Sequence, residues 1–180
     1  LVNKKLNSKF KLNDYFIFSL ISTICDLMPL KGFNRKILTI GFKNLVIKNK
    51  GLKKLISNNL KKKLTYKDIG FKIGPLINSS GRIAKANDVV ELFLSQNDDK
   101  INTIIDKMNS HNEIRKKIEQ ENLSLINLKK YYSKNVVFIY NKRFHEGTIG
   151  IVAAKLSQLF NKPCFIVTES DGLLKCSIRS

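Results

Sequence analysis

Residues that could bind phosphate follow a short apolar run in the C-terminal third of the chain. The run Val136–Tyr140 consists of β-branched and aromatic residues without interruption, which predicts a strand buried on both faces of a parallel sheet. The loop after it carries His145, Gly147, Thr148 and Gly150 at the start of a helical pattern. Glycine lets a backbone approach a ligand, Thr148 can cap the helix, and free N–H groups of the first turn attract anions. The loop is therefore a candidate phosphate site, and the alternative is ordinary polar surface.

One arginine and one aspartate are further candidates for a functional site. Arg82 closes the segment Ile69–Arg82, in which two glycines, a proline and Asn78–Gly81 predict a tight loop. A guanidinium can hold a phosphate through two parallel hydrogen bonds, but the segment can equally be a plain turn. Asp26 ends an apolar helical pattern. A carboxylate there is either an exposed or capping side chain or a ligand of a hard divalent cation.

Helical patterns precede the candidate phosphate loop. Residues 1–12 are basic and polar, and Asn13 or Asp14 could cap a first helix whose buried face would be Phe16, Leu20, Ile24 and Leu27. Further helices are expected over 36–45, 51–60 and 87–94. A long one over 100–131 would extend about 45 Å and suits a connector of two lobes. On this helix, Arg115 and Glu119 lie one turn apart, which predicts a surface ion pair that contributes little to stability.

The candidate loop itself belongs to a predicted βαβ unit. Asn161–Pro163 would stop the helix that follows the loop, and Cys164–Val167 is a second apolar run of strand character. Two strands joined by a helix form a right-handed crossover, whose ligands bind at the carboxyl end of the first strand. A last strand is expected over Leu173–Ser180, at a sheet edge. The fold class is therefore α/β.

Composition points to a polyanionic partner. The 180 residues carry a net charge of +19, which fits nucleic acid or an anionic membrane surface. Of 33 basic residues only five are arginines, so an AT-rich genome could also explain the lysines without any selection for binding. Three cysteines without CxxC spacing indicate neither a zinc site nor a disulfide framework, and a reducing cytoplasm fits them. Because the chain begins at Leu1 and stops directly after a predicted strand, we expect an internal piece of a longer protein.

Five separated segments, taken in order, resemble the RecJ group of the DHH phosphoesterase superfamily, which are single-strand-specific exonucleases. Thr23–Leu30 with Asn34-Arg35 is similar to the pattern Thr-Val-Ala-Asp-Val-x-Pro-Leu…Asn-Arg, and Gly74–Arg82 to Gly-Pro…Asn-Ala-x-Gly-Arg. Met108–Arg115 matches the family's connector helix. Phe144–Ala154 is similar to the pattern Trp-His-x-Gly-Val-Ile-Gly-Ile-Val-Ala-Ser, and Cys176–Ser180 to the pattern Gly-Ser-x-Arg-Ser.

The resemblance implies roles for individual residues. Asp26 would ligate one of two Mn²⁺ or Mg²⁺ ions, and Arg82 would contact the substrate's phosphate. Further substrate-binding residues would be Asn78, Gly81, His145, Gly147, Thr148, Gly150, Ser177, Arg179 and Ser180. The implied substrate is single-stranded DNA, digested 5′ to 3′ in repair and recombination, with no membrane and with single-strand-binding or recombination proteins as partners.

The resemblance also implies a domain layout. Residues 1–68 would be the C-terminal part of a DHH domain and 69–131 a substrate-contact loop with the long connector helix. Residues 132–180 would begin the DHH-associated substrate-binding domain.

Several departures from the family pattern limit what this chain could do. Phe144 replaces tryptophan, and Cys176 replaces a glycine. The family's Asp-x-Asp and Asp-His-His motifs do not occur in the sequence, so most metal ligands are missing and we expect the chain alone to be inactive. Two rivals remain open, a non-catalytic single-strand-binding scaffold and a phosphoesterase of oligoribonucleotides or nucleotides. Relatives of the latter kind carry a Gly-Gly-Gly-His loop that this sequence lacks.

Overall fold

The computed structural model describes residues 15–60, 64–84 and 86–180, which form two compact units. The first contains residues 15–60, 64–78 and 87–108, and the second contains 79–84, 86 and 109–180. The basic segment 1–12 and the expected cap at Asn13 or Asp14 lie outside the described residues. The domain limits implied by the family resemblance stay a prediction.

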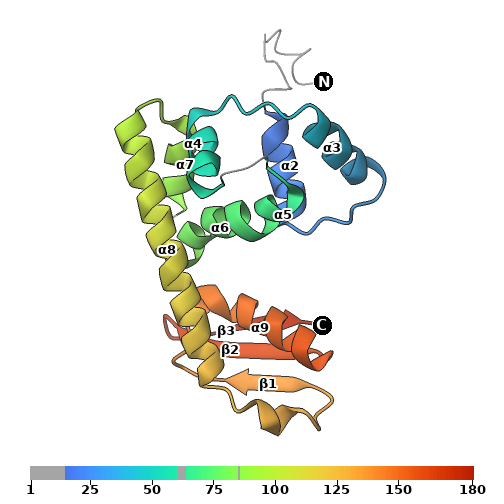
Figure 1. The fold of residues 1–180 in the computed structure, drawn as a ribbon. Helices are drawn as coiled ribbons and strands as arrows, with labels where there is room; N and C mark the ends of the chain where they lie inside the picture. The colour runs from blue at the N-terminus through green and yellow to red at the C-terminus, as the bar shows by residue number, and fades with distance from the viewer. Residues whose placement is uncertain (1–14, 61–63, 85) are drawn as a thin grey trace. The chain divides into compact units, whose positions relative to one another are not determined.

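The first unit is built from helices (Figure 1). Their bounds are α2 Phe16–Cys25, α3 Gly32–Lys43, α4 Lys50–Asn59, α5 Tyr66–Asp68, the π-helix η2 Ile69–Ile73, α6 Gly74–Ile83, α7 Asn87–Leu94 and α8 Asp98–Ser124. Helices α6 and α8 each contribute to both units. The core is aliphatic, with Leu20, Leu55, Ile73, Leu92 and Ile105 fully buried. The expected helix over 87–94 is confirmed.

The buried face of α2 differs from the predicted one. Ile17, Leu20 and Ile21 face the core, whereas Leu27 is 88% exposed and Phe16 is only partly buried. The prediction extended the helical pattern to Leu27, but α2 ends at Cys25 and the chain turns away. The prediction is therefore right for Leu20 and in part for Ile24, while Ile17 and Ile21 are buried in place of Phe16 and Leu27.

The segment Ile69–Arg82 is helical, so the prediction of a tight loop there is wrong. The amide of Gly74 donates to the carbonyl of Ile69, five residues back, which is the hydrogen bond of a widened π turn. This turn directly precedes Pro75, which has no N–H to give to a regular helix. A Cβ on Gly74 would lie 2.5 Å from the Cys25 sulfur. This glycine thus serves the packing of two helices and does not mark a turn.

A buried carboxylate begins this helical stretch. Asp68 accepts hydrogen bonds from the Thr65 hydroxyl at 2.7 Å and the Thr65 amide at 3.1 Å, forming a capping box, and pairs with Lys72 at 2.9 Å. The Thr65 hydroxyl and then the Lys72 ammonium lower the pKa of Asp68 from 3.8 to about 2.

This depressed pKa predicts an acid-dependent loss of stability. The interactions of ionised Asp68 contribute fully above its unfolded pKa and are lost as the pH falls from about 4 through about 2. Asp68→Asn should therefore be less stable than the wild type at pH 6, and the gap should narrow towards pH 2. Urea unfolding midpoints of both proteins across this pH range measure the gap. A gap that stays constant with pH would contradict the role given to Asp68.

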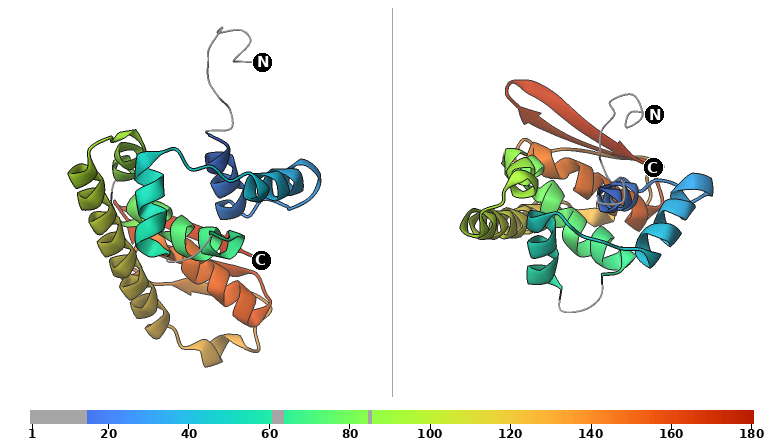
Figure 2. Two further views of the ribbon diagram at one scale, coloured as in Figure 1. Left: turned by 45° about the horizontal axis from the view of Figure 1, so that its top comes forward. Right: turned by 90° about the horizontal axis from the view of Figure 1, so that it is seen from above.

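The second unit holds a three-stranded mixed sheet. Strands β1 (Val137–Tyr140) and β2 (Cys164–Ser170) pair in parallel, and β3 (Leu173–Arg179) pairs antiparallel with β2. Helix α9 (Glu146–Phe160) connects β1 to β2 and lies against one face of the sheet (Figures 1 and 2). The predicted βαβ unit and the last strand at a sheet edge are confirmed, and the fold is α/β with a large helical share.

Strand β1 is not buried on both faces as predicted. Val137 and Ile139 are buried under α9, whereas Phe138 and Tyr140 on the other face are 59% and 49% exposed. β1 is an edge strand of the described sheet, and α9 together with Leu123, Ile126 and Leu128 packs on the face that carries Val137 and Ile139. The apolar run therefore indicated a strand correctly but not its environment.

The long helix is shorter than predicted. α8 ends at Ser124, and the chain continues through a turn into a short 3-10 helix, η3, over Leu128–Tyr131. Inside the second unit, Ile126 joins the core formed by the sheet and α9. Ile126 and Leu128 pack on that core and do not extend the helix, while Leu125 is exposed.

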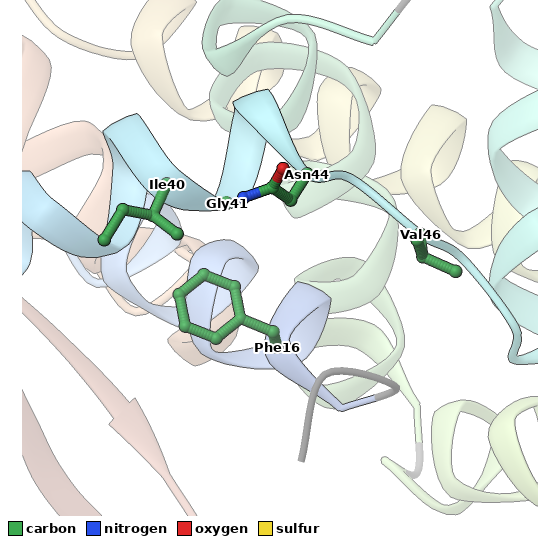
Figure 3. Close-up of a pocket in the computed structure, with 5 residues that line it drawn as sticks. All are labelled: Phe16, Ile40, Gly41, Asn44 and Val46. Carbon is green, nitrogen blue, oxygen red and sulfur yellow. The ribbon is translucent and has the colours of Figure 1, made fainter. Parts of the chain in front are cut away.

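A small apolar pocket of about 340 Å³ lies in the first unit between α2 and α3 (Figure 3). Its lining is Phe16, Ile40, Gly41, Asn44 and Val46. Gly41 permits the close approach, because a Cβ there would lie 2.6 Å from Leu20 Cδ1. A pocket with one amide and no ionisable group offers no catalytic chemistry. None of the helices in the described ranges combines the length and apolar character that a membrane crossing requires.

Candidate functional site

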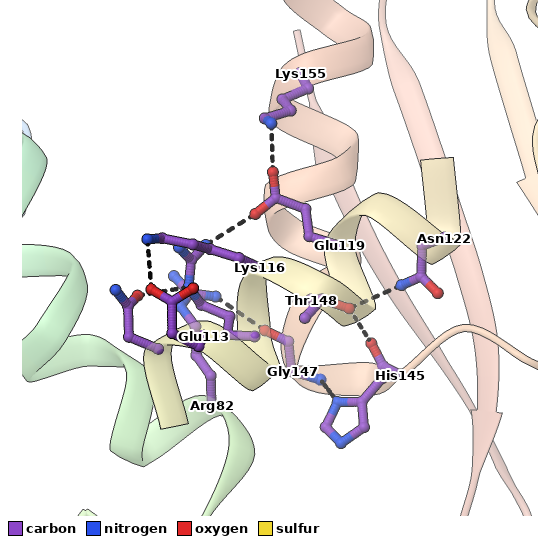
Figure 4. Close-up of polar contacts among 11 residues, drawn as sticks. Arg82, Glu113, Lys116, Glu119, Asn122, His145, Gly147, Thr148 and Lys155 are labelled. Carbon is purple, nitrogen blue, oxygen red and sulfur yellow. Dashed lines mark hydrogen bonds and ion pairs between the residues drawn. The ribbon is translucent and has the colours of Figure 1, made fainter. Parts of the chain in front are cut away.

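The first turn of α9 is capped by His145 rather than by Thr148, so that prediction is wrong. His145 Nδ1 accepts a hydrogen bond from the Gly147 amide at 3.1 Å, and Thr148 is completely buried. The Thr148 hydroxyl donates to the His145 carbonyl at 2.9 Å and accepts from Asn122 Nδ2 at 2.9 Å (Figure 4). Since Nδ1 is an acceptor here, the neutral imidazole carries its proton on Nε2.

Gly147 brings the end of α6 against the start of α9. A Cβ on Gly147 would lie only 2.0 Å from the Arg82 carbonyl oxygen and 2.9 Å from its carbonyl carbon. Arg82 Nη1 in turn donates to the Gly147 carbonyl at 3.2 Å. The glycine is needed for this close approach, and Arg82 is thereby fixed beside the candidate loop.

Two more arginines lie within electrostatic reach of Arg82. Burial lowers the pKa of Arg82, and the neighbouring charges of Arg115 and Arg179 lower it further, while Glu119 acts in the opposite direction. The guanidinium stays charged, because its ordinary pKa is far above neutrality. Three guanidiniums with one nearby carboxylate make this region positive, which favours an anionic ligand.

Strand β3 also contributes side chains to the positive region. A Cβ built on Gly150 would lie 3.4 Å from the Ser177 hydroxyl and 3.9 Å from Arg179 Nη2. Without that Cβ, the backbone of α9 leaves room beside a hydroxyl and a guanidinium. Ser180 follows directly and is exposed. We call the group Arg82, His145, Gly147, Gly150, Ser177 and Arg179 the arginine site.

The carboxylate of Glu146, in the first turn of α9, is neutralised by a lysine of β3. Glu146 accepts a hydrogen bond from Lys175 of β3, which lowers the pKa of Glu146 and raises that of Lys175. The pair keeps the Glu146 charge from opposing an anion at the same helix end. Lys175, Ser177 and Arg179 alternate along β3, so they lie on one face of the strand.

The ion pair of Arg115 and Glu119 is buried, so the prediction of a surface pair is wrong. The side chains are 13% and 7% exposed, their atoms Nη1 and Oε2 are 2.8 Å apart, and Lys155 of α9 also pairs with Glu119. Helix α9 covers this face of α8, which spacing along one helix could not reveal. Arg115 also donates from Nε to Asn112 Oδ1 at 3.2 Å.

Asp26 lies in the first unit, at the C-terminal end of α2. Leu27 has a left-handed φ of 52°, and the amide of Met28 donates to the Thr23 carbonyl, so the helix closes in a Schellman motif. Glycine usually occupies the position of Leu27 in this motif, so the turn after Asp26 is strained. Asn34 Nδ2 donates to the Pro29 carbonyl at 3.0 Å and holds the next segment.

The carboxylate of Asp26 is accessible to a ligand. The residue is exposed, and its carboxylate makes no hydrogen bond or ion pair with the described residues. Nowhere in the described ranges do three or more His, Cys, Asp or Glu side chains gather as a metal site would need. Asp26 therefore fits one ligand of a divalent cation, and the residues described around it do not complete a coordination sphere.

Asn78 and Gly81 lie on α6 and not in a loop. Both are exposed, while Ser79 and Ser80 between them are fully buried. Asn78 is grouped with the first unit and Gly81 with the second. Gly81 lies beside Arg82 because the two are neighbours in sequence, and the substrate contacts predicted for Asn78 and Gly81 stay predictions.

Comparisons with known proteins find relatives in sequence and in fold. No family model matches the chain. It is 31% identical over 174 residues to the single-stranded-DNA-specific exonuclease RecJ of Escherichia coli, covering 89% of this chain and 30% of that protein. Against RecJ of Bacillus subtilis it is 30% identical over 169 residues, covering 89% of this chain and 21% of the relative. The chain therefore spans less than a third of the length of these relatives.

Solved structures show the same fold. The crystal structure of RecJ in complex with Mn²⁺ from Thermus thermophilus superposes with a TM-score of 0.86 at 23% identity, over 99% of this chain and 27% of that one. The corresponding Mg²⁺ complex gives a TM-score of 0.82 at 22% identity, over 99% of this chain and 28% of the other.

The relatives that match in sequence are named as exonucleases, a class of nucleases. Both relatives are named RecJ, and the chain is similar to them along nine-tenths of its length. It corresponds to one segment of the RecJ exonucleases and not to their full extent.

Proposed function

We propose that this chain is part of a metal-dependent exonuclease of single-stranded DNA, and that its arginine site binds phosphates of the strand. The observation that carries the proposal is the contact between Arg82 and the Gly147 backbone. It places a guanidinium at the start of α9, within electrostatic reach of Arg115 and Arg179. The names of the sequence relatives support single-stranded DNA as the ligand.

Each member of the arginine site has a distinct role in this proposal. Arg82 donates hydrogen bonds to two non-bridging oxygens of a phosphate. Arg179 and the Ser177 hydroxyl bind the same phosphate from another side. His145 donates from Nε2, because its Nδ1 is occupied by the Gly147 amide. Gly150 leaves room for the backbone of the strand. Asn78, Gly81, Thr148 and Ser180 are proposed as further contacts or supports.

Asp26 is proposed to hold one Mn²⁺ or Mg²⁺ ion, as the metals in the structures of the RecJ relatives suggest. Such ions activate water and stabilise the leaving oxygen in phosphodiester hydrolysis. Asp26 supplies one carboxylate, held at a strained turn, and we expect the chain alone to show no nuclease activity. The full enzyme is proposed to digest 5′ to 3′ in the cytoplasm, during repair and recombination, with single-strand-binding or recombination proteins as partners.

Arg82→Ala should weaken the binding of single-stranded DNA by about tenfold to a hundredfold, because it removes charge-assisted hydrogen bonds. The slope of log K against log salt should also become shallower, by about 0.7 for each phosphate that the protein no longer neutralises. Fluorescence anisotropy with a labelled oligothymidylate, at several salt concentrations, measures both quantities.

Lys130→Ala is the matched control, since it removes one positive charge from an exposed residue of η3 in the same unit. It should change affinity far less than Arg82→Ala. An equal weakening of binding in the two variants would mean that only net charge matters and would overturn the proposal. Titration with an oligouridylate of the same length separates a preference for DNA from one for RNA.

A further inference from the structure

One face of α8 carries polar side chains that are buried against α9. Arg115, Glu119 and Asn122 are spaced by four and three residues, so they lie on the same side of the helix. Glu119 is 6% and Asn122 is 3% exposed. Figure 4 shows both side chains among their polar partners. Buried polar groups destabilise a fold unless they are paired, so their partners show what this face does.

Glu119 is paired with two cations from different helices. Its Oε2 lies 2.8 Å from Arg115 Nη1, and its Oε1 pairs with Lys155 of α9. Lys155 is 55% exposed, whereas Arg115 is largely buried and is held by both Glu119 and Asn112. The carboxylate therefore fixes the guanidinium of Arg115 in one orientation.

Asn122 continues the same face towards the start of α9. Its Nδ2 donates to the Thr148 hydroxyl, and that hydroxyl donates to the His145 carbonyl. The three groups form a chain of hydrogen bonds that ends at the residue capping α9. α8 thus holds α9 at two points, through Lys155 and through Thr148.

We propose that Glu119 is a positioning residue for the arginine site: it orients Arg115, whose charge reaches Arg82, and it holds α9 on α8 through Lys155. The proposal rests on the proposed function, because it concerns binding of phosphate at that site. Glu119 acts through the groups that it holds and does not itself touch the phosphate.

Because Glu119 is negatively charged, the direction in which its removal changes phosphate affinity tests the proposal. A carboxylate among guanidiniums opposes an anion, so its removal should strengthen phosphate binding if only charge matters. If Glu119 positions Arg115 and α9, removal should weaken binding although the site becomes more positive. The two views therefore predict opposite changes in affinity.

Glu119→Gln keeps the shape of the side chain and removes its charge. We expect about tenfold weaker binding of a short oligothymidylate, as the absence of one charge-assisted hydrogen bond implies. The control is Glu113→Gln on the same helix, which removes an equal charge and an exposed ion pair with Lys116. It should bind as tightly as the wild type or slightly more tightly.

Amide hydrogen exchange of the free protein provides a readout that does not depend on the ligand. Faster exchange at residues 147–150 in Glu119→Gln, but not in Glu113→Gln, supports the positioning role of Glu119. This result would stand even if the wild type did not bind DNA, which would show that the proposed function is wrong. Unchanged exchange at these amides overturns the positioning role. So does an affinity of Glu119→Gln equal to or greater than that of the wild type.

Discussion

Gly147→Ala is expected to abolish the folded second unit or to destabilise it severely. The new Cβ would lie 2.0 Å from the Arg82 carbonyl oxygen, a backbone atom that cannot rotate away. Either α6 and α9 separate or their backbones shift, and overpacking of this kind costs about 3 kcal/mol. Urea unfolding followed by circular dichroism, with amide exchange on β2 to isolate the second unit, measures the decrease in stability.

The matched control is Gly81→Ala on the helical segment next to Arg82. Its nearest non-neighbouring atom would be Ala86 Cβ, at an ordinary 3.8 Å. Because alanine favours helix over glycine, this variant should be as stable as the wild type or about 1 kcal/mol more stable. Similar stabilities for the two variants would show that Arg82 and Gly147 are not in close contact in solution.

Gly51→Ala should have a comparable effect on the first unit. Gly51 lies in the first turn of α4, and a Cβ there would be 2.0 Å from the Leu92 carbonyl oxygen of α7. Asn49 ties the same two helices, since its Nδ2 donates to the Phe93 carbonyl at 2.7 Å. The backbones would have to part, which should lower the stability by about 3 kcal/mol. The urea midpoint of the first unit, followed by exchange of the α4 amides, measures it.

Gly70→Ala is the corresponding control for the first unit. Its Cβ would meet only the Cγ2 methyl of Ile24, at 3.4 Å, which is an ordinary van der Waals contact. We expect a change within about 1 kcal/mol. If Gly51→Ala were equally mild, the close packing of α4 on α7 would be wrong.

The βαβ unit could be predicted because its signals are local. Apolar runs of strand character flank a helical pattern, and the stop at Asn161–Pro163 needs no knowledge of distant residues. Asn161 indeed ends α9 in a left-handed conformation. The prediction for the segment around Gly74 failed for the opposite reason. Its glycine is required by Cys25 of another helix, and a sequence cannot show that neighbour.

The candidate site could be predicted only in part, for the same reason. Arg82, His145 and Arg179 stand out by residue type, and the structure places all three in the second unit. Glu119 and Asn122 were missed as parts of the site, because only the docking of α9 buries them. Their spacing on α8 is the available signal, and for Arg115 with Glu119 it predicts only a surface pair. Roles in substrate binding stay predictions for every one of these residues.

The central claim is that phosphates of single-stranded DNA bind at the arginine site. The most direct test is a titration of the ¹⁵N-labelled chain with an oligothymidylate, following backbone amides and arginine Nε–H signals by NMR. We predict the largest shifts at the amides of residues 147–150 and at the Nε–H groups of Arg82 and Arg179. Shifts confined to lysine-rich segments such as 50–54, with the arginine site unchanged, would contradict this claim.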